Sequence, residues 1–246
     1  MRPIRTWPLR GSICLFAAAA GLAAATSAAP GQNLSAAPAS ARLLSEAEAG
    51  GGIREALAQG VGRAIERLGR TDGFLADQAV RILIPGKIRK ITDGARKLGA
   101  GKLVDAFEVS MNRAAEQAVS VSADVFSDAV RQMTWQDALA IVRGGEDAGT
   151  KYFRKATEGR LREQFLPIVR SATDASGATR NFKKLSKRSA LLPGLGGDPE
   201  QPFDLDEYVT QRALDGLFHY VAEEEKSIRK DPLGQASNLL RRVFSR

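Results

Sequence analysis

Apolar residues recur at three- and four-residue steps along most of the chain after residue 44, which is the spacing of one face of an α-helix. The first such stripe carries Ile53, Leu57, Val61, Ile65 and Leu68. The same periodicity, with turn and capping residues between the stripes, predicts further helices. They are expected at about residues 88–98, 102–118, 122–133, 134–142, 148–176, 179–187 and 204–230, with a terminal piece at 233–244.

Two local features qualify this helical pattern. Val80, Ile82 and Ile84 alternate with polar residues, which indicates one short extended segment. A single segment cannot form a sheet, so it is expected to pack along the helices. Pro167 is expected to kink the helix over 148–176 or to begin a new one. The sequence therefore predicts an all-α fold, an irregular multi-helix bundle.

The N-terminus has the pattern of a Sec-type signal peptide. Arg2, Arg5 and Arg10 precede an apolar stretch over 13–25, and small residues follow it, so cleavage is expected after Ser27 or Ala28. An uncleaved membrane anchor is the alternative. The predicted organisation is a signal peptide at 1–28, a flexible leader at 29–43 and a single helical domain at 44–246. A periplasmic or secreted location follows from this organisation.

The composition excludes several kinds of reactive or metal-binding site from the exported chain. Loss of three arginines with the signal peptide lowers the formal charge from +8 to +5. Cys14 is the only cysteine and lies at the start of the apolar stretch, so the exported chain has no disulfide, thiol nucleophile or cysteine metal site. His219 is the only histidine, and no G-x-S-x-G motif is present, which argues against a catalytic triad. We expect no cofactor and no metal site; a Ca²⁺ or Mg²⁺ held by glutamates alone is the weaker alternative.

A group of polar residues is the best candidate for a site. On a helical wheel of the last long helix, Glu224 and Glu225 fall inside the apolar arc, where an unpaired carboxylate is costly. The helix over 102–118 offers partners for them. The candidate cluster is Glu108, Asn112, Arg113, Glu116, Glu224 and Glu225. It is either a polar pocket able to perform acid–base chemistry or a salt-bridge network that joins two helices.

Two basic clusters could bind anionic partners. They are Lys87, Arg89, Lys90, Arg96, Lys97 and Lys102, and Arg180, Lys183, Lys184, Lys187 and Arg188. Export makes nucleic acid an unexpected partner, so an anionic membrane surface or envelope polymer is the functional interpretation. The alternative is that these residues are ordinary solvated helix faces.

Several stretches in order along the chain resemble a family of exported bacterial proteins catalogued as domain of unknown function 4197. The matching stretches are GIREAL (52–57), DGFL (72–75), MNRAAEQA (111–118), KYFRKAT (151–157), FLPIV (165–169), YVTQRALDGLF (208–218) and AEEEKSIR (222–229). The resemblance implies an all-helical envelope protein and supplies no activity or catalytic residue.

Together these features predict a cell-envelope binding or interaction protein. Its partner would be an envelope protein, an anionic membrane surface or a small ligand between helices. The alternative is a hydrolase that uses the carboxylates of the candidate cluster.

Overall fold

The computed structural model describes residues 46–177, 179–183 and 203–230. Internal contacts group the chain into two units, 1–42 and 43–246, and every described residue belongs to the second. The predicted signal peptide (1–28), leader (29–43) and terminal piece (233–244) lie outside the described residues. The division into domains therefore stays a prediction.

The described part of the chain is helical and contains no strand, so the prediction of an all-α bundle is confirmed. The helices are α1 (Glu46–Gly69), α2 (Gly86–Lys97), α3 (Gly101–Ser120), α4 (Ala123–Gln132), α5 (Trp135–Arg143), α6 (Ala148–Ala175) and α8 (Leu205–Lys230). Of the helix predicted at 179–187, residues 179–183 are described and are helical.

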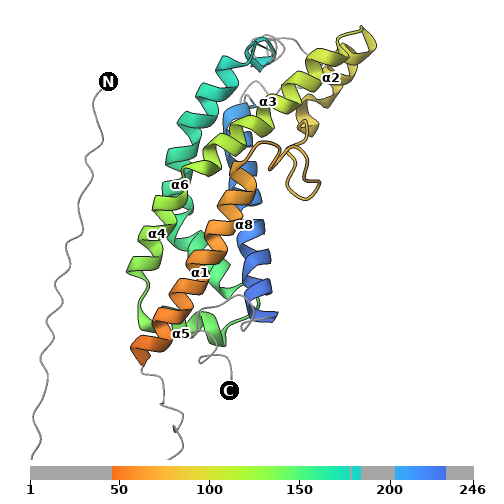
Figure 1. Cartoon of the computed structure of the whole chain (residues 1–246). Coiled ribbons are helices and arrows are strands. Elements are labelled where there is room, and N and C mark those ends of the chain that lie inside the picture. Colours follow the sequence, from red (N-terminus) through yellow and green to blue (C-terminus); the bar gives the residue numbers. More distant parts are fainter. Residues whose placement is uncertain (1–45, 178, 184–202, 231–246) are drawn as a thin grey trace, which may run out of the picture. The chain divides into compact units, whose positions relative to one another are not determined.

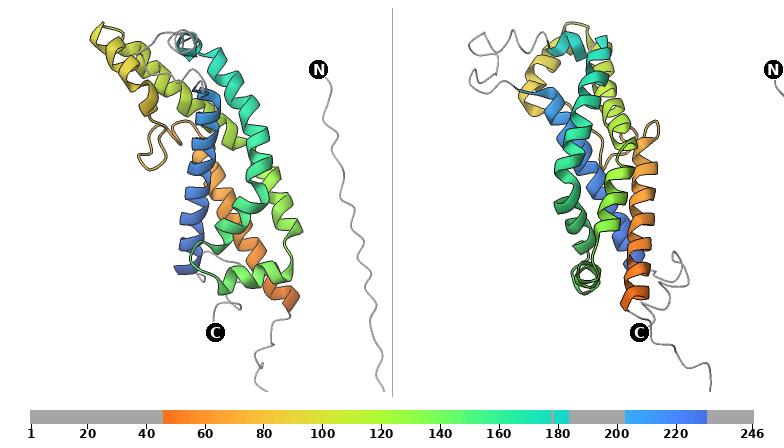
Figure 2. Two further views of the ribbon diagram at one scale, coloured as in Figure 1. Left: turned by 180° about the vertical axis from the view of Figure 1, so that it is seen from behind. Right: turned by 90° about the vertical axis from the view of Figure 1, so that its left-hand side faces the viewer.

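Helix α8 packs against α6, α3 and α1, and α3 also packs against α6. These four helices run alongside one another, with α5 across one end and α2 at the other (Figure 1). Figure 2 shows the same arrangement from two further directions. The face that α3 turns inward carries Ala114, Ala115 and Ala118, which are completely buried. Their small side chains let the neighbouring helices approach closely, and apolar burial of this kind is the main stabilising term of the fold.

Aromatic side chains connect α4, α6 and α8 within this core. The ring of Phe126 on α4 lies edge-on to Phe153 on α6 at 5.5 Å and to Phe218 on α8 at 6.0 Å between centroids. Edge-to-face contacts at these distances are favourable beyond the burial of area alone.

The start of α5 is capped by its own first residues. The hydroxyl of Thr134 accepts a hydrogen bond from the Asp137 backbone N–H at 3.1 Å, and the Asp137 carboxylate accepts one from the Thr134 N–H at 2.9 Å. This reciprocal pair is a capping box, which supplies acceptors for backbone donors that the first turn leaves unpaired.

Pro167 does not begin a new helix, because α6 continues through it as one helix from Ala148 to Ala175. The ring of Pro167 is on the exposed side of α6. Water can therefore hydrate the carbonyl group that loses its helical donor at the proline. Of the two expectations for Pro167, a kink or the beginning of a new helix, the second is therefore wrong.

Residues 81–85 belong to neither a helix nor a strand. Ile82 among them is buried, as the alternating pattern predicts. No helix in the described part of the chain is long and apolar enough to cross a membrane.

Candidate functional site

The six residues of the candidate cluster bind three different parts of the chain. The four on α3 bind the connection between α1 and α2. Glu224 binds α1, and Glu225 binds the start of α6. The structure therefore brings members of the cluster together on α3, and it places the two α8 glutamates with other partners.

Asn112 is completely buried, and its side-chain amide pairs with both backbone groups of Ile82, as the backbone of a neighbouring strand does in a sheet. Its Oδ1 accepts from the Ile82 backbone N–H at 2.8 Å, and its Nδ2 donates to the Ile82 carbonyl oxygen at 2.9 Å. Nδ2 also donates to the Glu108 carbonyl oxygen at 2.9 Å. One amide side chain thus satisfies both backbone groups of the buried Ile82, which therefore need no partner from a sheet.

Glu116 and Arg113 hold the turn that follows α1. The buried Glu116 Oε1 accepts hydrogen bonds from the backbone N–H groups of Phe74 and Leu75 at 3.2 and 3.4 Å. Arg113 joins Glu116 Oε2 at 2.7 Å to Asp72 Oδ1 at 2.6 Å. Asp72 adopts a positive φ of 66°, which is uncommon for a residue other than glycine. These ion pairs and hydrogen bonds stabilise that turn.

Glu108 makes a 2.7 Å ion pair with Arg81, next to the segment that Asn112 binds. All four α3 residues of the cluster therefore contact residues 72–82. The contacts expected between these α3 residues and the two α8 glutamates are not formed, because each polar group binds a different neighbouring part of the chain.

Glu224 makes a 2.6 Å ion pair with Arg63 of α1, and both side chains are partly exposed. Solvent screens such a pair, so its contribution to stability is small. The contact links the last third of α8 to the middle of α1.

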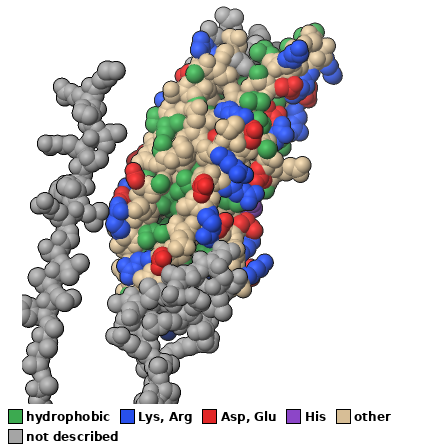
Figure 3. All heavy atoms as spheres, viewed as in Figure 1, with side chains coloured by type: hydrophobic (Ala, Val, Ile, Leu, Met, Phe, Trp, Pro, Cys, Tyr) green, Lys and Arg blue, Asp and Glu red, His purple; other side chains and the backbone are tan. Residues whose placement is uncertain are grey.

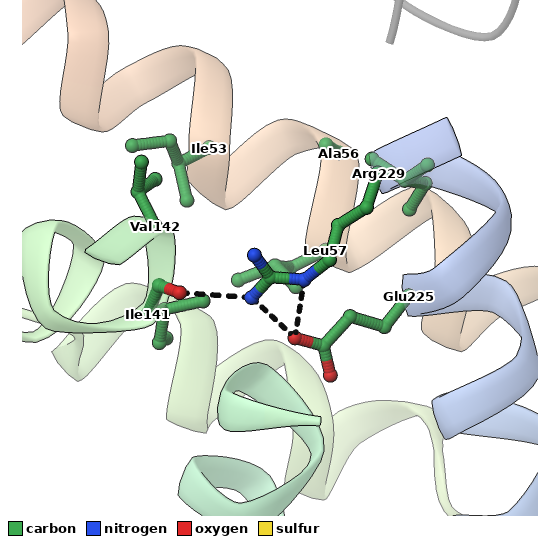
Figure 4. A pocket seen from close by; sticks show the side chains of 8 residues that line it. Ile53, Ala56, Leu57, Ile141, Val142, Glu225 and Arg229 are labelled. Atoms are coloured by element: carbon green, nitrogen blue, oxygen red, sulfur yellow. Dashed lines mark hydrogen bonds and ion pairs between the residues drawn. The ribbon is translucent and has the colours of Figure 1, made fainter. Parts of the chain in front are cut away.

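Glu225 is buried and caps α6 from another helix. Its carboxylate accepts hydrogen bonds at 2.8 Å from the backbone N–H groups of Gly149 and Thr150 and from the Thr150 hydroxyl. Arg229, one turn later on α8, donates to the same carboxylate and to the Ile141 carbonyl oxygen, both at 2.8 Å. Figure 4 shows Arg229 between Glu225 and the Ile141 carbonyl oxygen, among side chains of α1 and α5.

The position of Glu225 follows from the start of α6. Asp147 precedes that helix but supplies no side-chain cap, so the first backbone donors need another acceptor. A carboxylate at a helix N-terminus also interacts favourably with the helix dipole. A Cβ at Gly149 would lie 3.2 Å from the Glu225 carboxyl carbon, so the glycine gives the carboxylate room to approach.

A small cavity lies beside the Glu225–Arg229 pair. It measures about 30 Å³, and its wall is formed by α1, α5 and α8. The apolar lining residues are Ile53, Ala56, Leu57, Ile141, Val142 and Ile228. This volume is much smaller than the cavity of about 150 Å³ that binds benzene in a protein core.

A wider hollow of about 290 Å³ lies at the end of α1, beside the turn that Arg113 holds. Asp77 in its wall binds Arg67 of α1 at 3.0 Å and accepts a hydrogen bond from the Tyr220 hydroxyl of α8. Both carboxylates of its wall, Asp72 and Asp77, are thus paired with arginines. No short stretch of sequence contains this group, because its members come from three separate segments.

The Asp77–Tyr220 contact changes the pKa values of both groups. Burial raises the pKa of Tyr220, and the hydrogen bond to Asp77 adds to this effect, to about 12. Burial opposes ionisation of Asp77, but hydrogen bonds from Tyr220, the Ala79 N–H and Arg67 outweigh it and lower the Asp77 pKa. Asp77 is therefore charged and Tyr220 neutral at physiological pH.

Within the described residues, no three acidic, histidine or cysteine side chains lie close enough to hold a metal ion. His219 is exposed and lies edge-on to the Tyr220 ring, at 5.2 Å between centroids.

The first basic cluster lies on a hairpin formed by α2 and the start of α3, residues 86–106. Six basic and two acidic residues give this hairpin a net charge of +4. Ile88 and Thr92 of α2 are buried, whereas the described basic side chains are all exposed. In Figure 3, Lys and Arg side chains gather over α2 at this end of the molecule. The exposed basic residues are Arg89, Lys90, Arg96, Lys97 and Lys102.

The second basic cluster is only partly described, and its described members have structural contacts. Lys183 binds Asp174 at 2.8 Å and the buried Asp206 at 2.7 Å. Arg180 donates two hydrogen bonds to the Asp174 carbonyl oxygen. Lys184, Lys187 and Arg188 lie outside the described residues.

Comparison with known proteins places the chain in a family. No curated protein and no solved structure matches it. The model of the family described as protein of unknown function (DUF4197) matches residues 43–245, as the resemblance of the short motifs implied, and the chain belongs to that family.

Proposed function

We propose that this protein is an exported binding protein of the bacterial cell envelope, and that its α2–α3 hairpin binds anionic surfaces. The observation that carries the proposal is the net charge of +4 on a hairpin whose basic side chains point into solvent. Each lysine or arginine close to an anionic membrane contributes about 1 kcal/mol to binding. Four or five such residues on one hairpin are therefore enough for measurable binding at low salt.

The periodicity of α2 supports this proposal. Arg89 and Arg96, like Lys90 and Lys97, are seven residues apart, so each pair lies on one side of the helix. Ile88 and Thr92 are four residues apart and face the interior. Arg96 also pairs with Asp105 at 2.7 Å, which leaves Arg89, Lys90, Lys97 and Lys102 as the main candidates for contact with a partner.

The carboxylates of the candidate cluster favour binding over hydrolysis as the function. A hydrolase of the type considered needs two carboxyl groups that face one cleft. Here Glu116 and Glu225 are buried and accept backbone hydrogen bonds, while Glu108 and Glu224 pair with arginines. Such contacts give these side chains structural roles.

The binding proposal is tested by sedimentation with vesicles of phosphatidylcholine alone or mixed with phosphatidylglycerol. We expect binding only to the anionic vesicles, weakened by raised salt because salt screens the attraction. The variant Lys90→Gln/Lys97→Gln/Lys102→Gln should bind more weakly. The matched control, Arg143→Gln/Lys151→Gln/Lys155→Gln, removes the same charge from exposed residues of α5 and α6 and should bind like the wild type.

Absence of binding to anionic vesicles at low salt would contradict the proposal. Equal weakening of both triple variants would show that net charge matters and the hairpin does not. Export is tested separately by the mass of the protein from the periplasmic fraction, which should correspond to a chain that begins at Ala28 or Ala29.

A further inference from the structure

The turn between α2 and α3 has a defined backbone geometry. The Ala100 N–H donates to the Ala95 carbonyl oxygen at 2.9 Å, and the Gly99 N–H donates to that of Arg96 at 3.1 Å. Gly99 has a φ of 84°, which glycine adopts without strain. This is the Schellman pattern that commonly ends a helix, and it joins α2 to α3 through a short turn.

Leu98 projects from this turn into solvent. Its side chain is 88% exposed, against 56% for Leu83 and 49% for Leu103, the next most exposed of the described large apolar residues. The apolar contact of a Schellman turn joins the positions held by Ala95 and Ala100, so Leu98 has no part in it. The turn itself therefore gives no reason for a leucine at this position.

A lysine precedes each of two exposed leucines, Leu98 in the turn and Leu103 in the first turn of α3. Lys97 precedes Leu98, and Lys102 precedes Leu103, so the end of the hairpin presents two apolar side chains beside two exposed ammonium groups. This combination is typical of segments that bind at a membrane interface, where apolar side chains enter the acyl boundary and basic ones contact phosphates.

We propose that the end of the α2–α3 hairpin inserts into anionic bilayers, with Leu98 and Leu103 below the headgroups and Lys97 and Lys102 at the phosphates. This inference rests on the proposed function and specifies its partner as a lipid surface. Long lysine side chains suit this placement, because their alkyl stems lie along apolar surface while their ammonium groups stay hydrated.

The leucines distinguish a bilayer from other anionic partners. A soluble polyanion offers no apolar surface to Leu98, so it would be attracted by the lysines alone. A protein partner requires a wide complementary surface, whereas the convex turn exposes only two large apolar side chains. A fluid bilayer can surround the side chains of Leu98 and Leu103 without a preformed complementary surface.

The test compares two variants on two anionic probes. Leu98→Asn removes the apolar side chain that we propose to insert. Val121→Asn is the control, because Val121 is 45% exposed at the other end of α3. We expect Leu98→Asn to bind phosphatidylglycerol vesicles about tenfold more weakly than the wild type, since leucine burial is lost. Val121→Asn should bind them like the wild type, and neither change should alter binding to soluble polyphosphate.

A direct probe of insertion is available because Cys14 is the only cysteine of the chain. In a Cys14→Ser background, an environment-sensitive dye on Leu98→Cys should shift its emission to the blue with anionic vesicles. The same dye on Val121→Cys should not shift.

The outcomes separate the two proposals. If Leu98→Asn binds vesicles as tightly as the wild type while the triple lysine variant is weakened, insertion is overturned and the proposed function stands. If Leu98→Asn weakens binding to polyphosphate as much as binding to vesicles, Leu98 acts on the hairpin's own structure, and insertion is again overturned. If the wild type binds neither probe at low salt, the proposed function fails as well.

Discussion

At the scale of single residues, the Asp77–Tyr220 contact is the clearest electrostatic feature of the described chain. The phenol is withdrawn from water, and its hydroxyl donates a hydrogen bond to the Asp77 carboxylate. Arg67 binds the same carboxylate and also lies over the Tyr220 ring, 4.2 Å from its centroid. Three segments, α1, the turn after it and α8, thus meet at one tyrosine.

We expect Tyr220, one of the three tyrosines, to titrate at about pH 12, and this is measured by phenolate absorbance. Asp77→Asn should lower the Tyr220 pKa, because it removes the charge that opposes phenolate formation. The value should stay above the ordinary value of about 10, since burial remains. An unchanged pKa in Asp77→Asn would contradict the assigned cause.

The same shift has a consequence for stability. Between about pH 10 and about pH 12 the folded state keeps the Tyr220 proton while the unfolded state loses it, so the free energy of unfolding falls as pH rises through this window. Urea unfolding at pH 9 and pH 11 measures this fall. The free energy of unfolding should fall less between these two pH values for Tyr220→Phe than for the wild type.

At the scale of elements, buried side chains of one helix hydrogen-bond with backbone groups of a segment far away in the sequence. Asn112 of α3 pairs with the backbone of Ile82, and Glu225 of α8 caps α6. In both cases a buried polar side chain satisfies backbone groups that the local sequence leaves without partners. These side chains therefore set how the elements join.

Glu224 and Glu225 allow a matched test of whether a buried polar side chain stabilises the contact between helices. Glu225→Gln should lower the free energy of unfolding by about 3 kcal/mol, because it removes the charge of a buried group bound to Arg229 and to the start of α6. Glu224→Gln makes the same chemical change one residue earlier, at a partly exposed ion pair, and should cost less than about 1 kcal/mol.

The measurement for this pair is urea unfolding followed by circular dichroism. Similar losses for the two variants would contradict the structural role of Glu225. A change in vesicle binding with either variant, at unchanged stability, would show that the glutamates contribute to the function.

At the scale of the whole molecule, the bundle is stabilised by packing and by its buried polar contacts, because a chain with a single cysteine forms no internal disulfide. The connection of α4, α6 and α8 through Phe126, Phe153 and Phe218 lies at the centre of this packing. The binding surface that we propose is at the end of the bundle that carries α2, away from α5. Core stability and binding should therefore respond to different substitutions.

Phe153→Ala should lower the free energy of unfolding by about 3–5 kcal/mol, because it leaves a cavity among three helices. Thermal and urea unfolding measure the loss. The comparison variant is Phe203→Ala, at a partly buried position before α8, and it should cost clearly less. At temperatures where Phe153→Ala is still folded, it should bind anionic vesicles like the wild type.

The sequence alone determined the helical class, because the 3.6-residue period of apolar positions is a local property of each segment. The stripe from Ile53 to Leu68, the capping box at Thr134 and the start of α6 near Ala148 are all visible in short stretches of residues. The wheel of α8 placed both Glu224 and Glu225 in the apolar arc; only Glu225 is buried, whereas Glu224 is partly exposed and pairs with Arg63.

The tertiary structure decided which groups those polar side chains bind. Glu225 and Gly149 are 76 residues apart, and Asn112 and Ile82 are 30 apart, so no local spacing contains these contacts. They depend on how α3, α6 and α8 pack, which is a cooperative result of burying all the apolar faces at once. For the same reason, only the folded chain shows that Leu98, an apparent continuation of the stripe of α2, extends into solvent at the end of the hairpin.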